Sequence, residues 1–208
     1  MRRLLQTSLL LAGLLGLNVA HAGAVTINFD GLAPDTTVTN QFPEATFSSN
    51  VGFEIRTLSR VFAPSTPNFI CTGTSAGGSN CSQDVFVSFT NPVNALSFLV
   101  VGINSVGTIG LVDIFDASNM LLGTVNIVGE GRTPTPGLVE LGAFSNVGKI
   151  SIRNVTDAYG LGYDDFTFNT DAMAIPEPAT LALVGLGLAA AGLSRRRARS
   201  LHTRLPRL

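Results

Sequence analysis

Hydrophobic residues in the middle of the chain occur in short runs, several of which alternate with polar residues. In KISIRNV, over residues 149–155, the isoleucines alternate with Lys149, Ser151 and Arg153. A period of two places successive side chains on opposite faces of a β-strand. No long segment between residues 23 and 174 shows a helical period. Nine segments, broken by Gly, Asn, Pro and Asp, are predicted as strands: 25–29, 52–58, 84–89, 95–101, 109–115, 121–128, 138–142, 149–155 and 163–168.

The spacing of these strands predicts the fold class. They follow one another about every ten residues, with turn residues between them, which is typical of an antiparallel β-sandwich. We therefore predict an all-β, jelly-roll-like sandwich over residues 23–174. Two long polar segments, 59–83 and 129–137, are predicted as loops, and they either contact a ligand or simply connect strands.

The first 22 residues have a different pattern. Met1, Arg2 and Arg3 precede an apolar stretch, which ends in Ala20-His21-Ala22. This order is typical of a secretory signal peptide, with small residues where signal peptidase cleaves. We predict export and a mature chain that begins at Gly23; the alternative is an N-terminal membrane helix that stays attached.

An apolar segment also lies near the other end, at residues 179–193. At 1.5 Å per residue, its 15 residues would form a helix of about 22 Å, against a hydrocarbon core of about 30 Å. Such a short transmembrane helix spans only with local thinning of the bilayer. An arginine cluster, predicted to stay on the cytoplasmic side, follows it: Arg195, Arg196, Arg197 and Arg199.

The apolar segment is preceded by Pro176, Glu177 and Pro178. This motif, the apolar run and the arginines, over residues 175–199, resemble the PEP-CTERM sorting signal of Gram-negative bacteria. The resemblance implies recognition by an exosortase, a membrane protease-transpeptidase. It further implies an inner-membrane intermediate and delivery to the cell surface or extracellular matrix. Residues 200–208, an expected unstructured tail, extend further than the family usually shows; an ordinary short anchor is the alternative.

The charge of the middle segment differs from that of the whole chain. Residues 23–174 contain thirteen acidic and five basic residues, a net charge of −8, because the two ends carry most of the cations. Nucleic acids and anionic membranes are bound through Lys and Arg, so this domain repels both. We predict no nucleic-acid partner.

Two cysteines, Cys71 and Cys81, flank a loop rich in Gly, Ser and Thr. In an exported protein we expect them to form a disulfide, with two free thiols as the alternative. Their spacing excludes a CxxC metal or redox site.

The middle segment lacks most catalytic side chains. The two histidines, His21 and His202, lie in the predicted signal peptide and the C-terminal tail, which excludes histidine-based triads and most zinc sites. A glycosidase needs two carboxylates that flank the scissile bond, whereas adjacent strand residues point to opposite faces. Sugar clefts also favour exposed aromatic rings, for which Tyr159 and Tyr163 are the candidates. We predict that the protein is not an enzyme.

The last predicted strand contains two adjacent carboxylates, in GYDDFTF. By alternation, Asp164 shares the core-facing side with Phe166 and Phe168, while Asp165 points the other way. A buried carboxylate needs a cation or several donors. Calcium is one solution, with Asp30 of NFDGL, directly after the first predicted strand, supplying another oxygen. The alternative is that these carboxylates cap backbone N–H groups in turns.

The pairing of NFDGL with GYDDFTF also resembles lectin-like or carbohydrate-binding β-sandwiches. That resemblance implies calcium and polysaccharide contact at Asp30, Asp164 and Asp165. Together these observations predict an exported, non-enzymatic protein of the cell surface or extracellular matrix with a structural or adhesive role. The alternatives are a calcium-dependent glycan-binding module and a secreted hydrolase.

Overall fold

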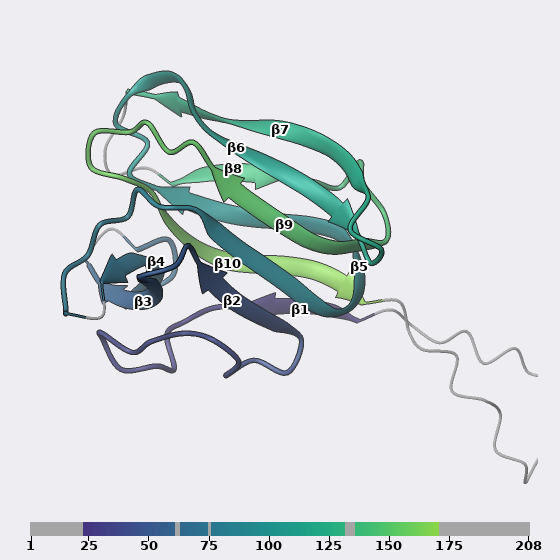
Figure 1. Cartoon of the computed structure of the whole chain (residues 1–208), viewed down its shortest axis with the longest axis horizontal. Helices are drawn as coiled ribbons and strands as arrows, with labels where there is room; N and C mark the ends of the chain where they lie inside the picture. Colours follow the sequence, from purple (N-terminus) through teal and green to yellow (C-terminus); the bar gives the residue numbers. More distant parts are fainter. Residues whose placement is uncertain (1–22, 61–62, 75, 132–135, 171–208) are drawn as a thin grey trace, which may run out of the picture. The chain divides into compact units, whose positions relative to one another are not determined.

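The structure is a computed structural model, and it describes residues 23–60, 63–74, 76–131 and 136–170 (Figure 1). The predicted signal peptide, the sorting signal with its transmembrane helix, and the tail lie outside these ranges. Within them, no helix is long and apolar enough to cross a membrane. Residues Ala22–Asp171 form one compact unit.

The described ranges contain ten strands and no helix, and all strand pairs are antiparallel. The strands are β1 (Ala24–Ile27), β2 (Ala45–Ser49), β3 (Phe53–Ser59), β4 (Asn68–Thr74), β5 (Val85–Val101), β6 (Val106–Asp116), β7 (Leu121–Glu130), β8 (Gly137–Glu140), β9 (Val147–Arg153) and β10 (Gly162–Thr170). Each predicted strand overlaps one of them, which confirms the all-β prediction.

Strand β5 belongs to both layers of the sandwich (Figure 1). Its first half pairs with β2 and β9, and its second half pairs with β10 and β8. One layer therefore has the order β2-β5-β9-β6-β7, and the other has the order β3-β4-β10-β5-β8 with β1 beside β10. The register with β9 shifts between Ser88 and Val93, where the chain passes from one layer to the other.

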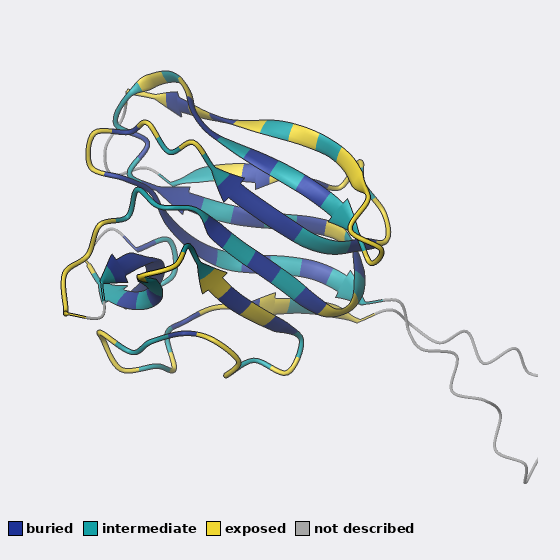
Figure 2. Ribbon diagram, in the orientation of Figure 1, coloured by how far each residue is buried: buried dark blue, intermediate teal, exposed yellow. Residues whose placement is uncertain are grey.

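Phenylalanine rings fill the space between the layers. Phe47 on β2 lies 5.6 Å from Phe166 on β10, and Phe89 on β5 lies 5.1 Å from Phe168, measured between ring centroids. All four side chains are buried. Figure 2 shows buried and exposed positions alternating along the strands, as the period of two in the sequence predicts.

Two strands lie where none was predicted. Residues 59–83 were expected to form one long loop, but β4 runs through this segment and pairs with β3 along its full length. Six of its seven residues are buried, so β4 shows no alternation of hydrophobic and polar residues. Pro67 and Gly73, residue types that are common in loops, also favoured the prediction of a loop. Strand β2 is only five residues long and was also missed.

The predicted direction of the Asp164 side chain is wrong, because β10 contains a β-bulge at this point. The register with β5 shifts directly after Asp164, and Asp165 has a φ of +47°. Tyr163 and Phe166 consequently face the same side, where both rings pack against Phe98. The centroid of the Phe98 ring lies 6.2 Å from that of Tyr163 and 5.1 Å from that of Phe166. Asp164 is buried as predicted, but on the opposite side of the strand from Phe166.

The two ends of the compact unit lie together. Ala24 on β1 is opposite Asn169 on β10, so the chain enters and leaves at the same end of the sandwich. The other end, where β10 begins at Gly162, is called the distal end here. The nine residues of β10 separate the two ends by about 30 Å, at roughly 3.3 Å per residue.

Candidate functional site

A hollow of about 440 Å³ opens at the distal end, and we call it the distal hollow. Its lining comes from β3, β4 and the end of β5, from the disulfide loop, and from the loops that precede β6 and β10. The side chains that matter for its chemistry are Arg60, Phe69, Ser79, Asn104 and Tyr159. None of these was predicted as a site residue except Tyr159, because they lie far apart in the sequence.

Two glycines allow three backbone segments to meet beneath the hollow. Gly160 has a φ of +76°, and a Cβ at this position would lie 2.4 Å from the carbonyl oxygen of Cys81. Gly102 has a φ of +89°, and its Cβ would lie 2.5 Å from the carbonyl oxygen of Gly160. The amide of Leu161 donates to the Cys81 carbonyl at 2.7 Å. Any larger residue would push these segments apart.

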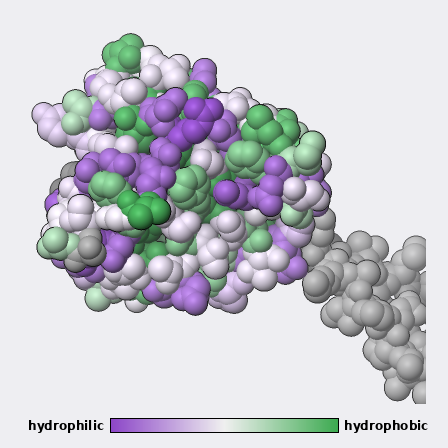
Figure 3. All heavy atoms as spheres, in the orientation of Figure 1, coloured by the Kyte–Doolittle hydropathy of each residue, from purple (hydrophilic) through white to green (hydrophobic). Residues whose placement is uncertain are grey.

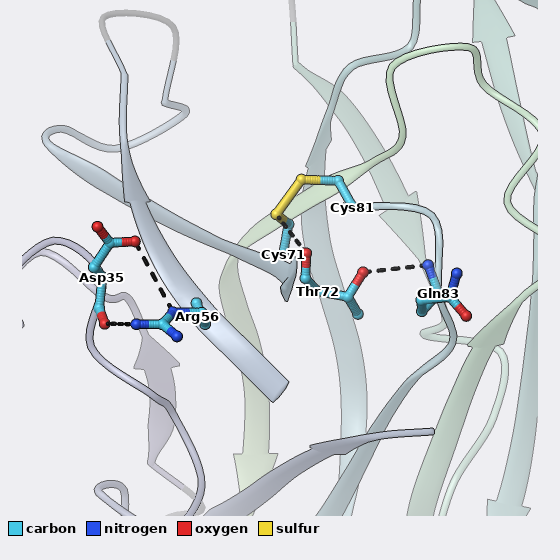
Figure 4. The surroundings of a disulfide bond; sticks show 6 residues. All are labelled: Asp35, Arg56, Cys71, Thr72, Cys81 and Gln83. Atoms are coloured by element: carbon cyan, nitrogen blue, oxygen red, sulfur yellow. Dashed lines mark hydrogen bonds and ion pairs between the residues drawn. A yellow bond between two sulfur atoms is a disulfide. The ribbon is translucent and has the colours of Figure 1, made fainter. Parts of the chain in front are cut away.

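The predicted disulfide between Cys71 and Cys81 is present, and it joins β4 to the loop that lines the hollow (Figure 4). The amide of Cys81 also donates to the carbonyl of Thr72 at 2.9 Å. The amide of Gln83 donates to the Thr72 hydroxyl at 3.2 Å. A covalent bond and local hydrogen bonds therefore fix this wall of the hollow.

Tyr159 lies at the rim, with 82% of its surface exposed. Its loop is held by Asp157, which is 4% exposed. The Asp157 carboxylate accepts hydrogen bonds from the amide of Ser105 at 2.9 Å and from the amide of Tyr159 at 3.1 Å. Asp157 thus joins the loops on both sides of the hollow. Aspartate commonly hydrogen-bonds the backbone two residues later, which was the available sequence signal.

Tyr163, the other aromatic candidate, does not reach the surface. It is 1% exposed and packs against Phe98 in the core, so the expectation that it forms a sugar platform is wrong. Burial raises the pKa of its phenol. Tyr159 is therefore the aromatic residue that remains as a platform in the described part of the chain.

The three carboxylates predicted to bind calcium contact one loop at residues 65–68. Asp164, which is fully buried, accepts hydrogen bonds from the amide of Ser65 at 3.2 Å and from its hydroxyl at 3.1 Å. Asp165 accepts from the same hydroxyl at 3.0 Å, and Asp30 accepts from the amide of Asn68 at 3.0 Å. Backbone capping, the alternative weighed from the sequence, thus accounts for Asp30 and Asp164.

Burial raises the pKa of Asp164 to about 7, although the backbone amide of Asp165 opposes this by donating to the carboxylate. In the described ranges, no group of three or more His, Cys, Asp or Glu side chains is placed to hold a metal ion. Calcium binding by Asp30, Asp164 and Asp165 stays a prediction.

A second hollow, of about 350 Å³, lies between the edge strands β7 and β8. Core side chains such as Val100 and Val139 line it together with the polar residues Asn126, Glu130 and Glu140, and no aromatic residue is among its described lining residues. On the face shown in Figure 3, hydrophobic residues lie in small groups between polar ones. The distal hollow is the better candidate site because an exposed aromatic ring, that of Tyr159, lies at its rim.

The class defined by these features is an antiparallel β-sandwich with a hollow at the end remote from the two ends of its compact unit. Residues 174–197 match the PEP-CTERM protein-sorting motif. The match includes Pro176, Glu177, Pro178 and the first three arginines of the cluster, so the predicted sorting signal is confirmed. The motif implies exosortase processing, and the chain is an exported protein sorted to the cell surface or extracellular space.

No curated protein matches the chain. Solved structures include the K2 cleaved adhesin domain of Lys-gingipain, a Porphyromonas gingivalis protein, at 12% identity and a TM-score of 0.45, covering 72% of this chain and 99% of that one. A Cellvibrio mixtus carbohydrate-binding module in complex with cellotriose has 14% identity and a TM-score of 0.30, with 67% and 99% covered. With TM-scores this low, these likenesses carry no argument about a ligand.

Proposed function

We propose that this protein is a non-enzymatic adhesive component of the cell surface or extracellular matrix, and that the distal hollow binds polysaccharide. The observation that carries the proposal is Tyr159, a largely exposed aromatic ring at the rim of a hollow built from fixed backbone segments. Tyrosine is enriched at interfaces because its ring offers an apolar face and its hydroxyl can form a hydrogen bond.

The lining of the hollow suits a sugar. A sugar ring presents apolar C–H groups on its face and hydroxyls at its edge, so it needs an aromatic surface with a few polar groups around it. Tyr159 and Phe69 supply the apolar surface, while Ser79 and Asn104 supply polar groups. The disulfide and the glycine contacts fix the walls beforehand, which limits the entropy lost on binding.

The position of the hollow also supports adhesion. The sorting motif follows β10, which ends at Thr170. The distal hollow lies at the beginning of the same strand, about 30 Å away by strand length. A protein held through its C-terminal end therefore leaves the hollow at the end of the domain remote from the attachment point.

The maturation steps belong to the same proposal. Signal peptidase cleaves before Gly23, and the C-terminal segment holds an inner-membrane intermediate until the exosortase removes it. Intact-mass measurement on protein from the native host tests both steps. The expected mass begins at Gly23 and ends near Pro178; a mass that still includes residues 179–208 would contradict the processing.

Polysaccharide pull-down with residues 23–174 tests the binding, since this segment includes all of the compact unit except Ala22. We expect retention on the host's extracellular polysaccharide and loss of retention in Tyr159→Ala. The matched control is Val51→Ala, which also removes a fully exposed apolar side chain, in the turn before β3. Retention that ends with EDTA would favour the calcium-dependent alternative, and release of sugar products would favour the hydrolase. Absence of binding to any polymer would overturn the proposal.

A further inference from the structure

The cations of the described domain differ in their partners. Arg153 donates to Asp113 at 3.0 Å and holds the pKa of that carboxyl below its usual value. Arg56 lies 3.6 Å from the Glu54 carboxylate. The Lys149 amine lies over two aromatic rings, at 5.3 and 5.6 Å from their centroids. Three of the four described cations are thus engaged with an anion or with aromatic rings.

Arg60 is the fourth, and it is exposed. Its Nη1 donates one hydrogen bond to the Ser59 carbonyl at 3.0 Å, and no carboxylate pairs with it within the described ranges. The side chain lines the distal hollow, and it also lines the adjoining hollow, of about 290 Å³, together with Ser79. A cation without an anionic partner therefore lies at the candidate site of a strongly acidic domain.

A second polar group in the same hollow lacks a partner. The side-chain oxygen of Asn104 is buried and accepts no hydrogen bond within the described residues. A buried acceptor without a donor is costly, and a hydroxyl group of a ligand would satisfy it. Tyr159, Arg60 and Asn104 thus supply an aromatic face, a cation and an acceptor in one hollow.

We propose that the distal hollow selects acidic sugars, with a hexuronate residue as the recognised unit. The Arg60 guanidinium pairs with the sugar carboxylate, the Tyr159 ring stacks against the sugar face, and the Asn104 side-chain oxygen accepts from a sugar hydroxyl. Arginine suits this role because its planar fork binds a carboxylate through two parallel hydrogen bonds. This inference rests on the proposed polysaccharide binding and adds the class of polymer.

The negative charge of the rest of the domain makes the binding of an acidic polymer more dependent on the distal hollow. Residues 23–174 carry a net charge of −8, so a polyanion is repelled over most of the surface. Non-specific adsorption of an acidic polymer is therefore disfavoured, and binding depends on the site that contains Arg60. We expect Arg60→Gln to remove discrimination between acidic and neutral sugars without unfolding the domain, since this side chain is exposed.

Titration calorimetry with two probes tests the inference: tetragalacturonate, and the same tetrasaccharide with its carboxylates reduced to alcohols. We expect the wild-type segment 23–174 to bind the acidic probe at least tenfold more tightly. Arg60→Gln should bring the two affinities within about twofold, and Arg60→Lys should recover part of the difference. Lys149→Gln, which changes the net charge equally but lies outside the hollow, should behave like the wild type.

The outcomes separate this inference from the proposed function. Equal affinity of the wild type for both probes, or an unchanged preference in Arg60→Gln, would overturn the selection of acidic sugars. If neutral polymers bind in a Tyr159-dependent way in that case, the adhesive function stands and only the polymer class is wrong. If neither probe nor any polymer binds, the proposed function itself fails.

Discussion

Asp157 joins the two loops that flank the distal hollow, so its replacement by alanine should weaken both the domain and the site. The carboxylate is 4% exposed and accepts hydrogen bonds from the amides of Ser105 and Tyr159. In Asp157→Ala both amides lose their acceptor, and a polar group left without a partner in a buried site is costly.

The size of the effect follows from these two bonds. A hydrogen bond to a charged group contributes about 1.5–3 kcal/mol, so two of them give a loss of roughly 3–6 kcal/mol in the free energy of unfolding. Asp157→Asn keeps one acceptor oxygen and should lose about half as much. Asp116 is a matched control, because it accepts from the amides of Ser118 and Met120 at 2.8 and 2.9 Å on an exposed hairpin. Water can replace that carboxylate, so Asp116→Ala should lose only about 1 kcal/mol.

Chemical denaturation of residues 23–174, followed by circular dichroism and tyrosine fluorescence, measures these losses. The same variants should be titrated with the host polysaccharide, where we expect Asp157→Ala to bind at least tenfold more weakly and Asp116→Ala to bind normally. The reasoning would be refuted if Asp157→Ala unfolded at the same denaturant concentration as Asp116→Ala, or if it bound the polymer like the wild type.

Three further predictions concern stability. Replacing both Cys71 and Cys81 by serine should lower the free energy of unfolding by about 3 kcal/mol, because the unfolded chain loses a loop closure; equal denaturation midpoints would contradict this. Gly160→Ala should unfold at a lower temperature in calorimetry, since its Cβ would lie 2.4 Å from the Cys81 oxygen, whereas Gly142→Ala, with open space around it, should not. The raised pKa of Asp164, about 7 against roughly 4 in the unfolded chain, means that the contribution of this group to stability is full below pH 4 and is lost as the pH rises through 7. Asp164→Asn should flatten this pH dependence of the denaturation midpoint; an unchanged slope would refute the assignment.

Much of the fold could be predicted because the sequence alternates where one face of a strand is buried. The failures have physical causes. Strand β4 is buried on both faces, so it offers no alternation to detect. The bulge at Asp165 adds one residue to the strand, so Asp164 lies on the face opposite to the one that strict alternation from Phe166 assigns to it.

The candidate site was harder to predict than the fold. Tyr159 and the cysteines carry local signals, an aromatic residue in a polar turn and a pair in a Gly-rich loop. Arg60, Asn104 and Asp157 carry none that points to a shared site, because the end of β3 and the loops at residues 102–105 and 154–161 meet only in the folded sandwich. Asp30 and Asp164 both contact residues 65–68; Asp30 follows β1 in the sequence, Asp164 lies in β10, and these two strands are paired.

The central claim is that the distal hollow binds the polysaccharide that surrounds the sorted protein. A binding isotherm of residues 23–174 on extracellular polysaccharide purified from the native host, compared between the wild type and Tyr159→Ala, tests it most directly. We predict saturable binding by the wild type and at least a tenfold weaker affinity for Tyr159→Ala, with unchanged thermal stability. Equal affinities of the two proteins would contradict the claim.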